Sequence, residues 1–334
     1  MTWSINIYFA LLFIFLNFVT GENKFSKLTS KEECEAYTNI KIVSMKKDKY
    51  TLPDDAFKLH YDAIVADTHN DLLYSVVKDR NEFFNEDGET QSGVSRLMNG
   101  GVKLQVFAYW IPQKNFKTSK DFILNEHKIL DSLAYKFSDK IQIAMTPDEV
   151  SGIISQNKLA VMTGIEGGTA LEGNLENIDE YYKLGVRYIT LTWNNSNEIG
   201  SSAVDEDLGK GTGLTEFGKE VVKRMNQVGI LVDVSHLGEK SFWDVVAVSD
   251  KPILASHSCC RALCPISRNL SDEQIKAIAK SGGVVMINFH SSFLKKGAKK
   301  KLQLANQVYA KQLNEIYNKY GSDKIKYNEE RYAF

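Results

Sequence analysis

The stretch LVDVSHLGEKSFWDVVAVSDKPILASHS, residues 231–258, decides the fold of this chain. It contains two short apolar runs, at 230–234 and 252–255, and each run ends in Ser-His. The residues between the two runs are typical of a helix. Two buried strands joined by a helix predict a parallel pair, and here each strand ends in an imidazole.

The same alternation of apolar runs and helical stretches extends over most of the chain. Most runs do not alternate apolar with polar residues, which is typical of strands buried on both faces of a parallel sheet. Seven runs are identified in this way: 64–66, 102–109, 159–163, 186–192, 230–234, 252–255 and 284–289. Alternating strands and helices predict an α/β fold.

Two α/β architectures fit this pattern. A doubly wound sheet usually binds its ligand beside a glycine-rich phosphate loop, and no such loop follows the first run. A (β/α)8 TIM-type barrel places its chemistry at the carboxyl ends of many strands, where this sequence has polar residues. We therefore expect an α/β barrel, here lacking the eighth strand because only seven runs are found.

Two of the helical stretches begin with recognisable capping residues. Thr146-Pro147-Asp148-Glu149 combines an N-cap threonine, a proline at the first helical position and a capping glutamate. Ser271-Asp272-Glu273-Gln274 has the pattern of a second capping box, followed by apolar residues at helical spacing. Both predict the start of a helix between two strands.

Composition narrows the classes of function. The chain has 334 residues and a formal net charge of −1, with no long basic block, so nothing indicates a nucleic-acid partner. The lysines between 295 and 301 are interpreted as the solvated start of a helix. No stretch after the N-terminus is apolar and long enough to span a membrane.

The N-terminus has an apolar run from Ile5 to Val19, which suits the core of a signal peptide better than a spanning helix. We expect a signal peptide over 1–21, a lead-in over 22–60 and a barrel domain over 61–334. A retained anchor is the alternative. Both readings predict a secreted or extracytoplasmic protein, and they leave membrane anchoring open.

The four cysteines are Cys34, Cys259, Cys260 and Cys264. They are too few for a disulfide framework, and their spacing matches no common zinc pattern. A disulfide between Cys34 and Cys264 is left open. Asn194 and Asn269 begin N-x-S sequons, but both lie beside predicted site residues, so we do not expect glycosylation there.

Residues that can bind a metal ion follow the first and third runs. His69 and Asp71 are two apart in an extended segment, so their side chains share one face and offer one nitrogen and one carboxylate oxygen. Glu166 follows the third run, where a buried carboxylate needs a cation or several donors. Taken separately, a hydrogen-bonded His-Asp pair and a solvated turn glutamate are the simpler interpretations.

His236 and His257 end the fifth and sixth runs, and each alone could be a core histidine. Together with the three residues above, however, they place five potential ligands at equivalent ends of four strands. This set suits two zinc ions bridged by Glu166, which can activate water and polarise a carbonyl. Arg268 follows on the same rim, where its guanidinium can bind a substrate carboxylate.

These residues resemble those of the membrane (renal) dipeptidase family, zinc dipeptidases with an amidohydrolase-like barrel. The matching segments run in order from about residue 61 to 290. They are 67–71, 96–97 with 100–102, 164–167, 185–188 with 191–192, 213–215 with 217–218, 233–236, 256–258 and 268–269. Each segment alone is unspecific, whereas their joint occurrence is highly specific.

The resemblance implies a metal-dependent barrel that hydrolyses dipeptides, including some with a D-residue at the C-terminal position. It implies that His69 and Asp71 hold one zinc ion, that His236 and His257 hold the other, and that Glu166 bridges the two and is catalytic. A metal-bound hydroxide then attacks the peptide carbonyl.

The resemblance also assigns residues to the substrate. It implies that Arg268 receives the free carboxylate of a dipeptide, and we expect Trp193 and Asn269 to contact the substrate as well. Many animal members have a histidine where Trp193 stands, so this difference is expected to alter specificity. The dipeptide is the expected partner, and homodimer formation is left open.

One further difference concerns the eighth strand, where the family has an aspartate that transfers a proton. No residue of this chain matches it before the sequence stops at Phe334, and we expect the sequence to be an incomplete copy. The alternative is a truncated, catalytically inactive metal- or peptide-binding paralogue. A third hypothesis, a lactonase or deaminase with the same metal cage, is weakened by Arg268, which favours a substrate with a free carboxylate.

Overall fold

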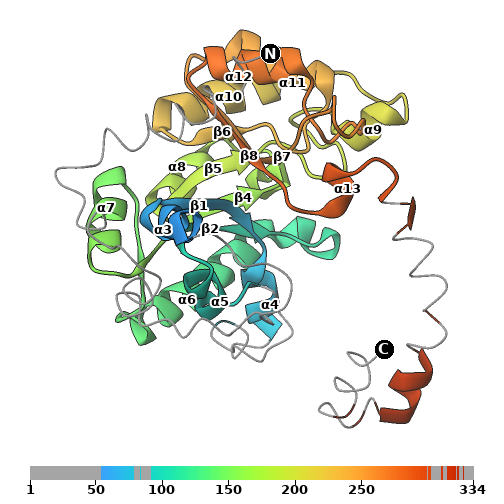
Figure 1. The fold of residues 1–334 in the computed structure, drawn as a ribbon. Helices are drawn as coiled ribbons and strands as arrows, with labels where there is room; N and C mark the ends of the chain where they lie inside the picture. The colour runs from blue at the N-terminus through green and yellow to red at the C-terminus, as the bar shows by residue number, and fades with distance from the viewer. Residues whose placement is uncertain are drawn as a thin grey trace.

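The computed structural model describes residues 54–78, 83, 92–298, 300, 301, 310, 314–320, 322 and 326. Strands alternate with helices along this part of the chain (Figure 1). The strands are β1 (Val65–Asn70), β2 (Val102–Trp110), β3 (Ile141–Ile143), β4 (Leu159–Glu166), β5 (Val186–Thr190), β6 (Leu231–Asp233), β7 (Ile253–Ser258) and β8 (Val284–Ile287).

The helices surround the strands in Figure 1. The longer ones are α3 (Asp54–Asp62), α6 (Ser119–Lys136), α7 (Pro147–Ser155), α8 (Glu176–Lys183), α10 (Glu216–Val228), α11 (Glu239–Val248) and α12 (Asp272–Lys280). The shorter ones are α4 (Leu72–Lys78), α5 (Val94–Asn99), η3 (Gln113–Thr118), η4 (Gly168–Leu171), α9 (Ala203–Asp207) and α13 (Ser291–Leu294). None of the helices in the described ranges is long and apolar enough to cross a lipid bilayer.

The strands form one parallel sheet in the order β1-β2-β4-β5-β6-β7-β8, which confirms the predicted α/β barrel architecture. The register aligns the ends of four neighbouring strands, because Trp110 pairs with Glu166, Glu166 with Thr190 and Thr190 with Asp233. Side chains at these ends therefore lie at one level of the barrel, at its carboxyl rim.

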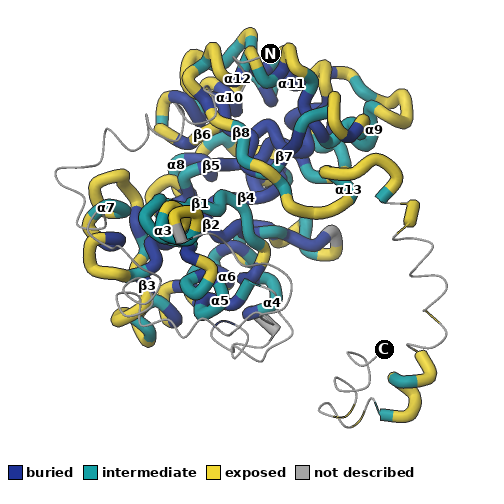
Figure 2. The backbone as a smooth tube through the Cα atoms, viewed as in Figure 1, coloured by how far each residue is buried: buried dark blue, intermediate teal, exposed yellow. Residues whose placement is uncertain are grey.

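The barrel is not closed by strand pairing. Within the described residues β1 pairs only with β2 and β8 only with β7, so the seam lies between β1 and β8, as expected for a missing eighth strand. The sheet is nevertheless strongly curved, since the Thr68 hydroxyl of β1 donates to the carbonyl of Ser256 in β7 at 2.8 Å. Val284 and Ile287 of β8 are exposed. Figure 2 shows that buried backbone lies mainly in the interior, whereas exposed backbone lies mainly on the outer helices and loops.

All seven predicted strands are present. The sheet also contains a short additional strand, β3, that was not predicted. Strand β3 pairs with residues 159–161 of β4, and β5 continues along the same edge from residue 163. The sequence of β3 is Ile-Gln-Ile, so the polar Gln142 divides its two apolar residues and no apolar run marks the strand. This short strand lies outside the main path of the barrel.

Both predicted capping boxes are confirmed. The Thr146 side chain accepts a hydrogen bond from the backbone of Glu149 at the start of α7. The Ser271 side chain accepts one from the backbone of Gln274 at the start of α12. In both helices the third residue bonds back to the cap, so the chain turns from loop to helix at the predicted positions.

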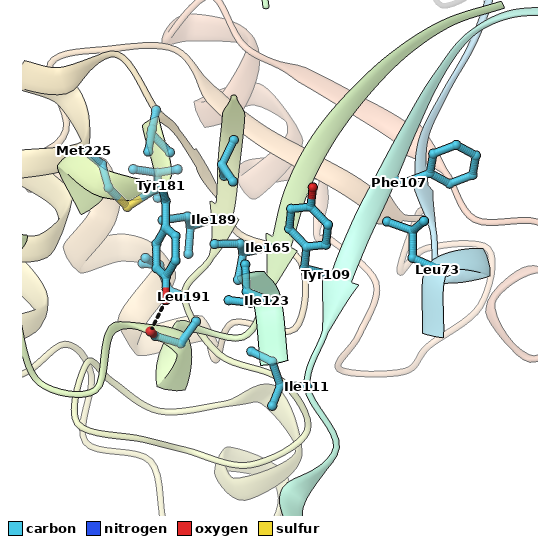
Figure 3. Close-up of a cluster of buried hydrophobic side chains, with 14 of the residues drawn as sticks. Leu73, Phe107, Tyr109, Ile111, Ile123, Ile165, Tyr181, Ile189, Leu191 and Met225 are labelled. Atoms are coloured by element: carbon cyan, nitrogen blue, oxygen red, sulfur yellow. Dashed lines mark hydrogen bonds between the residues drawn. The ribbon is translucent and has the colours of Figure 1, made fainter. Parts of the chain in front are cut away.

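The main core lies between the strands and the helices that cover them. Figure 3 shows a part in which Ile165 and Ile189 of the sheet lie near Ile123 of α6, and the Tyr181 hydroxyl of α8 donates to the carbonyl of Ala170 at 2.7 Å. A separate cluster of Val106, Tyr188 and Leu254 joins β2, β5 and β7. Buried apolar side chains thus hold the strands whose ends form the site.

Two of the sequence predictions fall outside the described residues. The signal peptide over 1–21 and Cys34, with its open pairing to Cys264, lie in the part of the chain before Asp54. Helix α3 begins inside the predicted lead-in, and Tyr61 at its end donates to the carbonyl of Asn99 at 2.9 Å.

Candidate metal centre

The carboxylate of Glu166 lies among three imidazoles at the carboxyl rim. Its Oε1 atom is 2.9 Å from Nε2 of His236, 3.5 Å from Nε2 of His69 and 3.6 Å from Nε2 of His257. The Glu166 side chain is only 4% exposed. Ligand-type atoms of His69, Glu166 and His257 all lie within 4.8 Å of one another. Residues at the ends of four strands are therefore brought into one cluster.

The fifth predicted ligand, Asp71, lies at the edge of this cluster. Its Oδ1 atom is 3.5 Å from Nε2 of His69, and its side chain is 52% exposed. The expectation that the two side chains share a face agrees with this contact. The structure thus gathers all five predicted ligands, four of them nearly buried and one open to solvent.

The ring of His69 is held from behind by Tyr188, whose hydroxyl is 2.9 Å from Nδ1. Tyr188 reaches His69 across the barrel because Gly164 in β4 leaves room for its ring. A Cβ atom at Gly164 would lie 2.3 Å from the Tyr188 ring. Since Nδ1 is occupied by this contact, Nε2 is the nitrogen that faces Glu166.

His236 adopts a left-handed backbone conformation, with φ of 67°. This conformation is uncommon for a residue other than glycine and costs free energy. The Nδ1 atom of His236 lies 3.1 Å from the side-chain oxygen of Asn194, and its carbonyl accepts from the Thr192 hydroxyl at 3.2 Å. The turn after β6 thus points Nε2 of His236 at Glu166.

Burial and charge set the protonation of the cluster. Burial raises the pKa of Glu166, but the charge of His69 and the hydrogen bond from His236 outweigh burial and hold that pKa well below its usual range. Burial lowers the pKa of His236 to about 4 and takes the pKa of His257 well below its usual value. Both imidazoles are therefore neutral near pH 7, and each keeps a lone pair for a cation.

His69 behaves differently from the other two histidines. Burial by itself lowers the pKa of His69, yet Tyr188, Glu166 and Asp71 together raise it well above its usual value. Its buried Nε2 atom has no hydrogen-bond partner among the described residues, since both carboxylates are 3.5 Å away. A positive charge is therefore favoured at this position.

The donor set fits a divalent metal ion. Imidazole nitrogens and carboxylate oxygens are the ligands that zinc accepts together in catalytic sites. A buried nitrogen without a partner beside two carboxylates is also the arrangement that a bound cation would satisfy. The residues present are thus compatible with metal binding at Glu166.

Arg268 adjoins the cluster, as predicted from its place in the sequence. Its Nη2 atom donates to Nε2 of His257 at 3.1 Å, and its guanidinium lies 5.5 Å from the centroid of the Phe293 ring. Burial lowers the pKa of Arg268 to about 10, so the side chain stays positive. No carboxylate of the described residues forms an ion pair with it.

Trp193 belongs to a row of aromatic rings beside His236. Its centroid is 6.4 Å from that of His236 and 5.4 Å from that of Trp110, and Trp110 lies edge-to-face with Tyr74 at 4.8 Å. Trp110 and Trp193 are partly exposed. An apolar surface thus borders the cluster on the side of His236.

Asn269 lies in a different environment from the one expected. Its side chain is fully buried. The oxygen accepts from the backbone of Cys259 at 3.1 Å, and the nitrogen donates to the carbonyls of Cys264 at 2.9 Å and Phe293 at 2.8 Å. These bonds brace the loop that holds Arg268, and the predicted substrate contact receives no support from them.

Several residues that hold the ligands were not predicted as site residues. Tyr188 and Asn194 contact imidazole nitrogens, and Ser256 Oγ lies 2.8 Å from Nδ1 of His257. Trp110, which directly follows the predicted run 102–109, was not predicted as a site residue. One signal was available, because Asn194 and Ser256 each adjoin a predicted site residue in the sequence.

Comparison with known proteins places this geometry in a family. Residues 54–326 match the family model described as membrane dipeptidase, peptidase family M19. The chain is 31% identical over 253 residues to an uncharacterized dipeptidase of Schizosaccharomyces pombe, covering 70% of this chain and 61% of that protein. It is 29% identical over 252 residues to dipeptidase 3 of Mus musculus, covering 73% of this chain and 50% of the relative. The chain thus spans about half to three-fifths of the length of these two relatives.

Two solved structures are similar as well. One is described as dipeptidase AC, a metallopeptidase of family M19, with a TM-score of 0.65 and 27% identity over 70% of this chain and 74% of that chain. The other is a metallopeptidase from Rhodobacter sphaeroides bound to a phosphinate mimic of the dipeptide L-Ala-D-Ala, with a TM-score of 0.65, 26% identity, and coverage of 70% of this chain and 75% of that one. From the family match over 54–326, together with the barrel and its cluster of ligands, the chain belongs to the membrane dipeptidase family, a family of metallopeptidases.

Proposed function

We propose that this protein hydrolyses dipeptides at a pair of zinc ions held around Glu166. The observation that carries the proposal is the placement of Glu166 Oε1 within 3.6 Å of three histidine Nε2 atoms from separate strands. The dipeptidases among its relatives support the same substrate class. A non-catalytic paralogue is not favoured, because the relatives include dipeptidases and a metallopeptidase bound to a dipeptide mimic.

Five residues would hold the metal. In this proposal His69 and Asp71 would hold one ion, His236 and His257 would hold the other, and Glu166 would serve both. When bound, zinc supplies Lewis acidity that polarises a peptide carbonyl and activates water for attack. The low pKa of Glu166 keeps its carboxylate ionised, and the neutral imidazoles of His236 and His257 need not release a proton before binding.

Arg268 would bind the free carboxylate of the dipeptide. Its guanidinium is buried, positive and without an ion-pair partner in the described part of the chain, so a carboxylate would relieve the cost of its burial. It is also in contact with His257, which places the recognised carboxylate next to the metal ligands. A carboxylate bound there would bring the adjoining peptide bond to the cluster.

Trp193 would contact the other end of the substrate. Trp193 borders His236, whereas Arg268 borders His257. A dipeptide anchored by its carboxylate at Arg268 would extend its N-terminal side chain towards the aromatic surface of Trp193 and Trp110. Asn269 would support substrate binding indirectly, because its hydrogen bonds brace the loop that holds Arg268. The predicted extracytoplasmic localisation stays a prediction, because residues 1–53 lie outside the described part.

The experiment combines metal analysis with a dipeptide panel. Purified full-length protein is expected to contain zinc and to release free amino acids from dipeptides such as L-Ala-L-Ala and L-Ala-D-Ala. Dialysis against a chelator is expected to abolish hydrolysis, and zinc is expected to restore it. Hydrolysis by the pure protein that resists complete metal removal would contradict the proposal.

A further inference from the structure

The carboxylate of Asp233, at the end of β6, is fully buried behind the histidine cluster and accepts four hydrogen bonds. Oδ1 accepts from the backbone N–H groups of Ser235 at 3.0 Å and Ser256 at 2.9 Å. Oδ2 accepts from the hydroxyls of Thr190 and Ser256, both at 2.6 Å. Asp233 thus joins β5, β6 and β7 at the level of Glu166, but it does not contact the cluster directly.

The link from Asp233 to the cluster passes through Ser256. A serine hydroxyl has one proton, and here it is donated to Asp233. The Ser256 oxygen is also 2.8 Å from Nδ1 of His257, so in that contact the oxygen accepts and Nδ1 carries the proton. The other nitrogen, Nε2, then keeps its lone pair.

A second contact leads independently to the same assignment. Nη2 of Arg268 is 3.1 Å from Nε2 of His257, and a guanidinium can only donate. Nε2 must therefore accept, which again places the proton of the neutral ring on Nδ1. The backbone of His257 is held in the same way, since its N–H donates to the Ser235 hydroxyl at 3.1 Å.

We propose that Asp233 is a positioning residue that acts through the Ser256 hydroxyl to set His257 in the tautomer whose Nε2 lone pair faces Glu166. The inference rests on the proposed function in one respect, namely that Nε2 of His257 is a metal ligand. The choice of tautomer itself is a property of the metal-free chain. Metal-binding histidines commonly depend on such a partner for their orientation and protonation.

Asp233→Asn is the sharpest test, because backbone N–H groups dictate the orientation of the introduced amide. The N–H groups of Ser235 and Ser256 can only donate, so the amide oxygen must face them and the amide nitrogen must face the hydroxyls. Ser256 then accepts from residue 233 and can no longer donate to it. The nearest acceptor for its proton is Nδ1 of His257 at 2.8 Å, since Ser235 Oγ is 3.3 Å away. His257 is thus expected to move its own proton to Nε2, where it faces Glu166 Oε1 at 3.6 Å and the contact with Arg268 is given up.

Nitrogen-15 NMR of the histidine rings measures directly which ring nitrogen of His257 carries the proton. The chain has six histidines, so selective labelling gives few signals, and His257→Gln identifies the signal of His257. In metal-free wild-type protein, Nδ1 of His257 is expected to have the shift of a protonated nitrogen. In Asp233→Asn, Nε2 is expected to have it instead. An unchanged tautomer in a folded Asp233→Asn variant would overturn the proposal.

Two further variants separate positioning from folding. Thr190→Val removes a donor to the same carboxylate oxygen but leaves the link to His257 intact, so it is expected to keep the wild-type tautomer. Ser256→Ala removes the link and leaves Asp233 in place. Only the contact with Arg268 then favours the wild-type tautomer, so a mixture of tautomers is expected. Should Asp233→Asn fail to fold, Ser256→Ala decides, and a wild-type tautomer there would overturn the proposal.

Zinc titration provides the second readout. Asp233→Asn is expected to bind zinc about 10–100-fold more weakly than wild type, and Thr190→Val is expected to bind within about threefold of it. Equal losses in both variants would indicate a merely structural role for Asp233. If wild-type protein binds no zinc, the proposed function fails, whereas the tautomer measurement still decides the role of Asp233.

Discussion

The carboxylate of Glu166 lies 2.9 Å from the imidazole of His236, although β5 separates their strands, β4 and β6, in the sheet. The contact is possible because the strand ends are in register and the turn after β6 takes a left-handed conformation at His236. The two side chains meet above the end of β5. Barrel curvature and one strained residue therefore create the centre of the site.

Replacing Glu166 by Gln is expected to lower zinc affinity by more than about 100-fold. This loss is larger than the roughly 10–100-fold loss expected when only a partner of a metal ligand is removed. The reason is that the amide keeps the shape but loses the negative charge shared by three imidazoles. Zinc content by elemental analysis and dipeptide hydrolysis measure the effect. Glu220→Gln on the surface of α10 is the matched control, and equal metal content in the two variants would show that Glu166 does not hold the ions.

Arg268→Ala is expected to raise KM for dipeptides by about 10–100-fold, the range for losing a charged hydrogen bond, with a smaller effect on kcat. The substrates are a dipeptide and its C-terminal amide. Wild type is expected to prefer the free carboxylate, and the variant is expected to lose this preference. Arg224→Ala, which breaks an ion pair with Asp179 elsewhere, is the control. A retained preference in Arg268→Ala would place the carboxylate elsewhere.

Trp193→Leu is expected to reduce kcat/KM for dipeptides with an aromatic N-terminal residue about three- to tenfold more than for alanyl dipeptides, because contacts between aromatic rings are lost. The measurement is the ratio of kcat/KM for the two substrates. Trp243→Leu, at an exposed position on α11, is expected to leave the ratio unchanged. Equal losses for both substrates in Trp193→Leu would argue against contact with the N-terminal side chain.

Gly164→Ala is expected to displace Tyr188, because the added Cβ would lie 2.3 Å from its ring. His69 then loses the partner of its Nδ1 atom, and zinc affinity is expected to fall by about 10–100-fold. Gly152→Ala in α7 is the control, since a Cβ there meets nothing within 4 Å and alanine favours the helix by up to about 1 kcal/mol. Wild-type zinc affinity in Gly164→Ala would show that Tyr188 does not support His69.

The buried carboxyl group of Glu126 is expected to make the free energy of unfolding depend on pH. This residue of α6 is fully buried, and neither carboxyl oxygen has a hydrogen-bond partner among the described residues. Burial, with a contribution from the negative charge of Asp71, raises its pKa to about 9. The folded chain therefore keeps a proton that the unfolded chain has released above about pH 4.3.

The stabilising effect of this proton is complete below the pKa of Glu126 in the unfolded chain. It is lost as the pH rises towards the pKa of Glu126 in the folded chain. Between about pH 5 and 9, Glu126 is expected to lower the free energy of unfolding by about 1.4 kcal/mol per pH unit. Glu126→Gln and Glu126→Leu should both remove this slope, whatever their effect at one pH. Urea unfolding of metal-free protein at several pH values measures it, and a wild-type slope in both variants would contradict a neutral Glu126.

Local patterns in the sequence were sufficient for the strands and helix starts that place the site. Runs of β-branched residues predicted the strands that end near Glu166, His236 and His257, and the capping boxes predicted the starts of α7 and α12. These signals are reliable because burial on both faces and the unpaired N–H groups of a helix constrain nearby residues. Strand β3 was missed because Gln142 divides its two isoleucines, so no apolar run marks it.

What the sequence by itself determined is the kind of residue at each strand end, and therefore the ligand types of the site. Tertiary structure alone decided which atoms meet. Gly164 admits Tyr188 to His69, Asp233 reaches His257 through a serine, and Asn269 turns inward to brace a loop. These relationships depend on hydrogen bonds and steric room between strands distant in sequence, which appear only when the curved sheet brings the strands together.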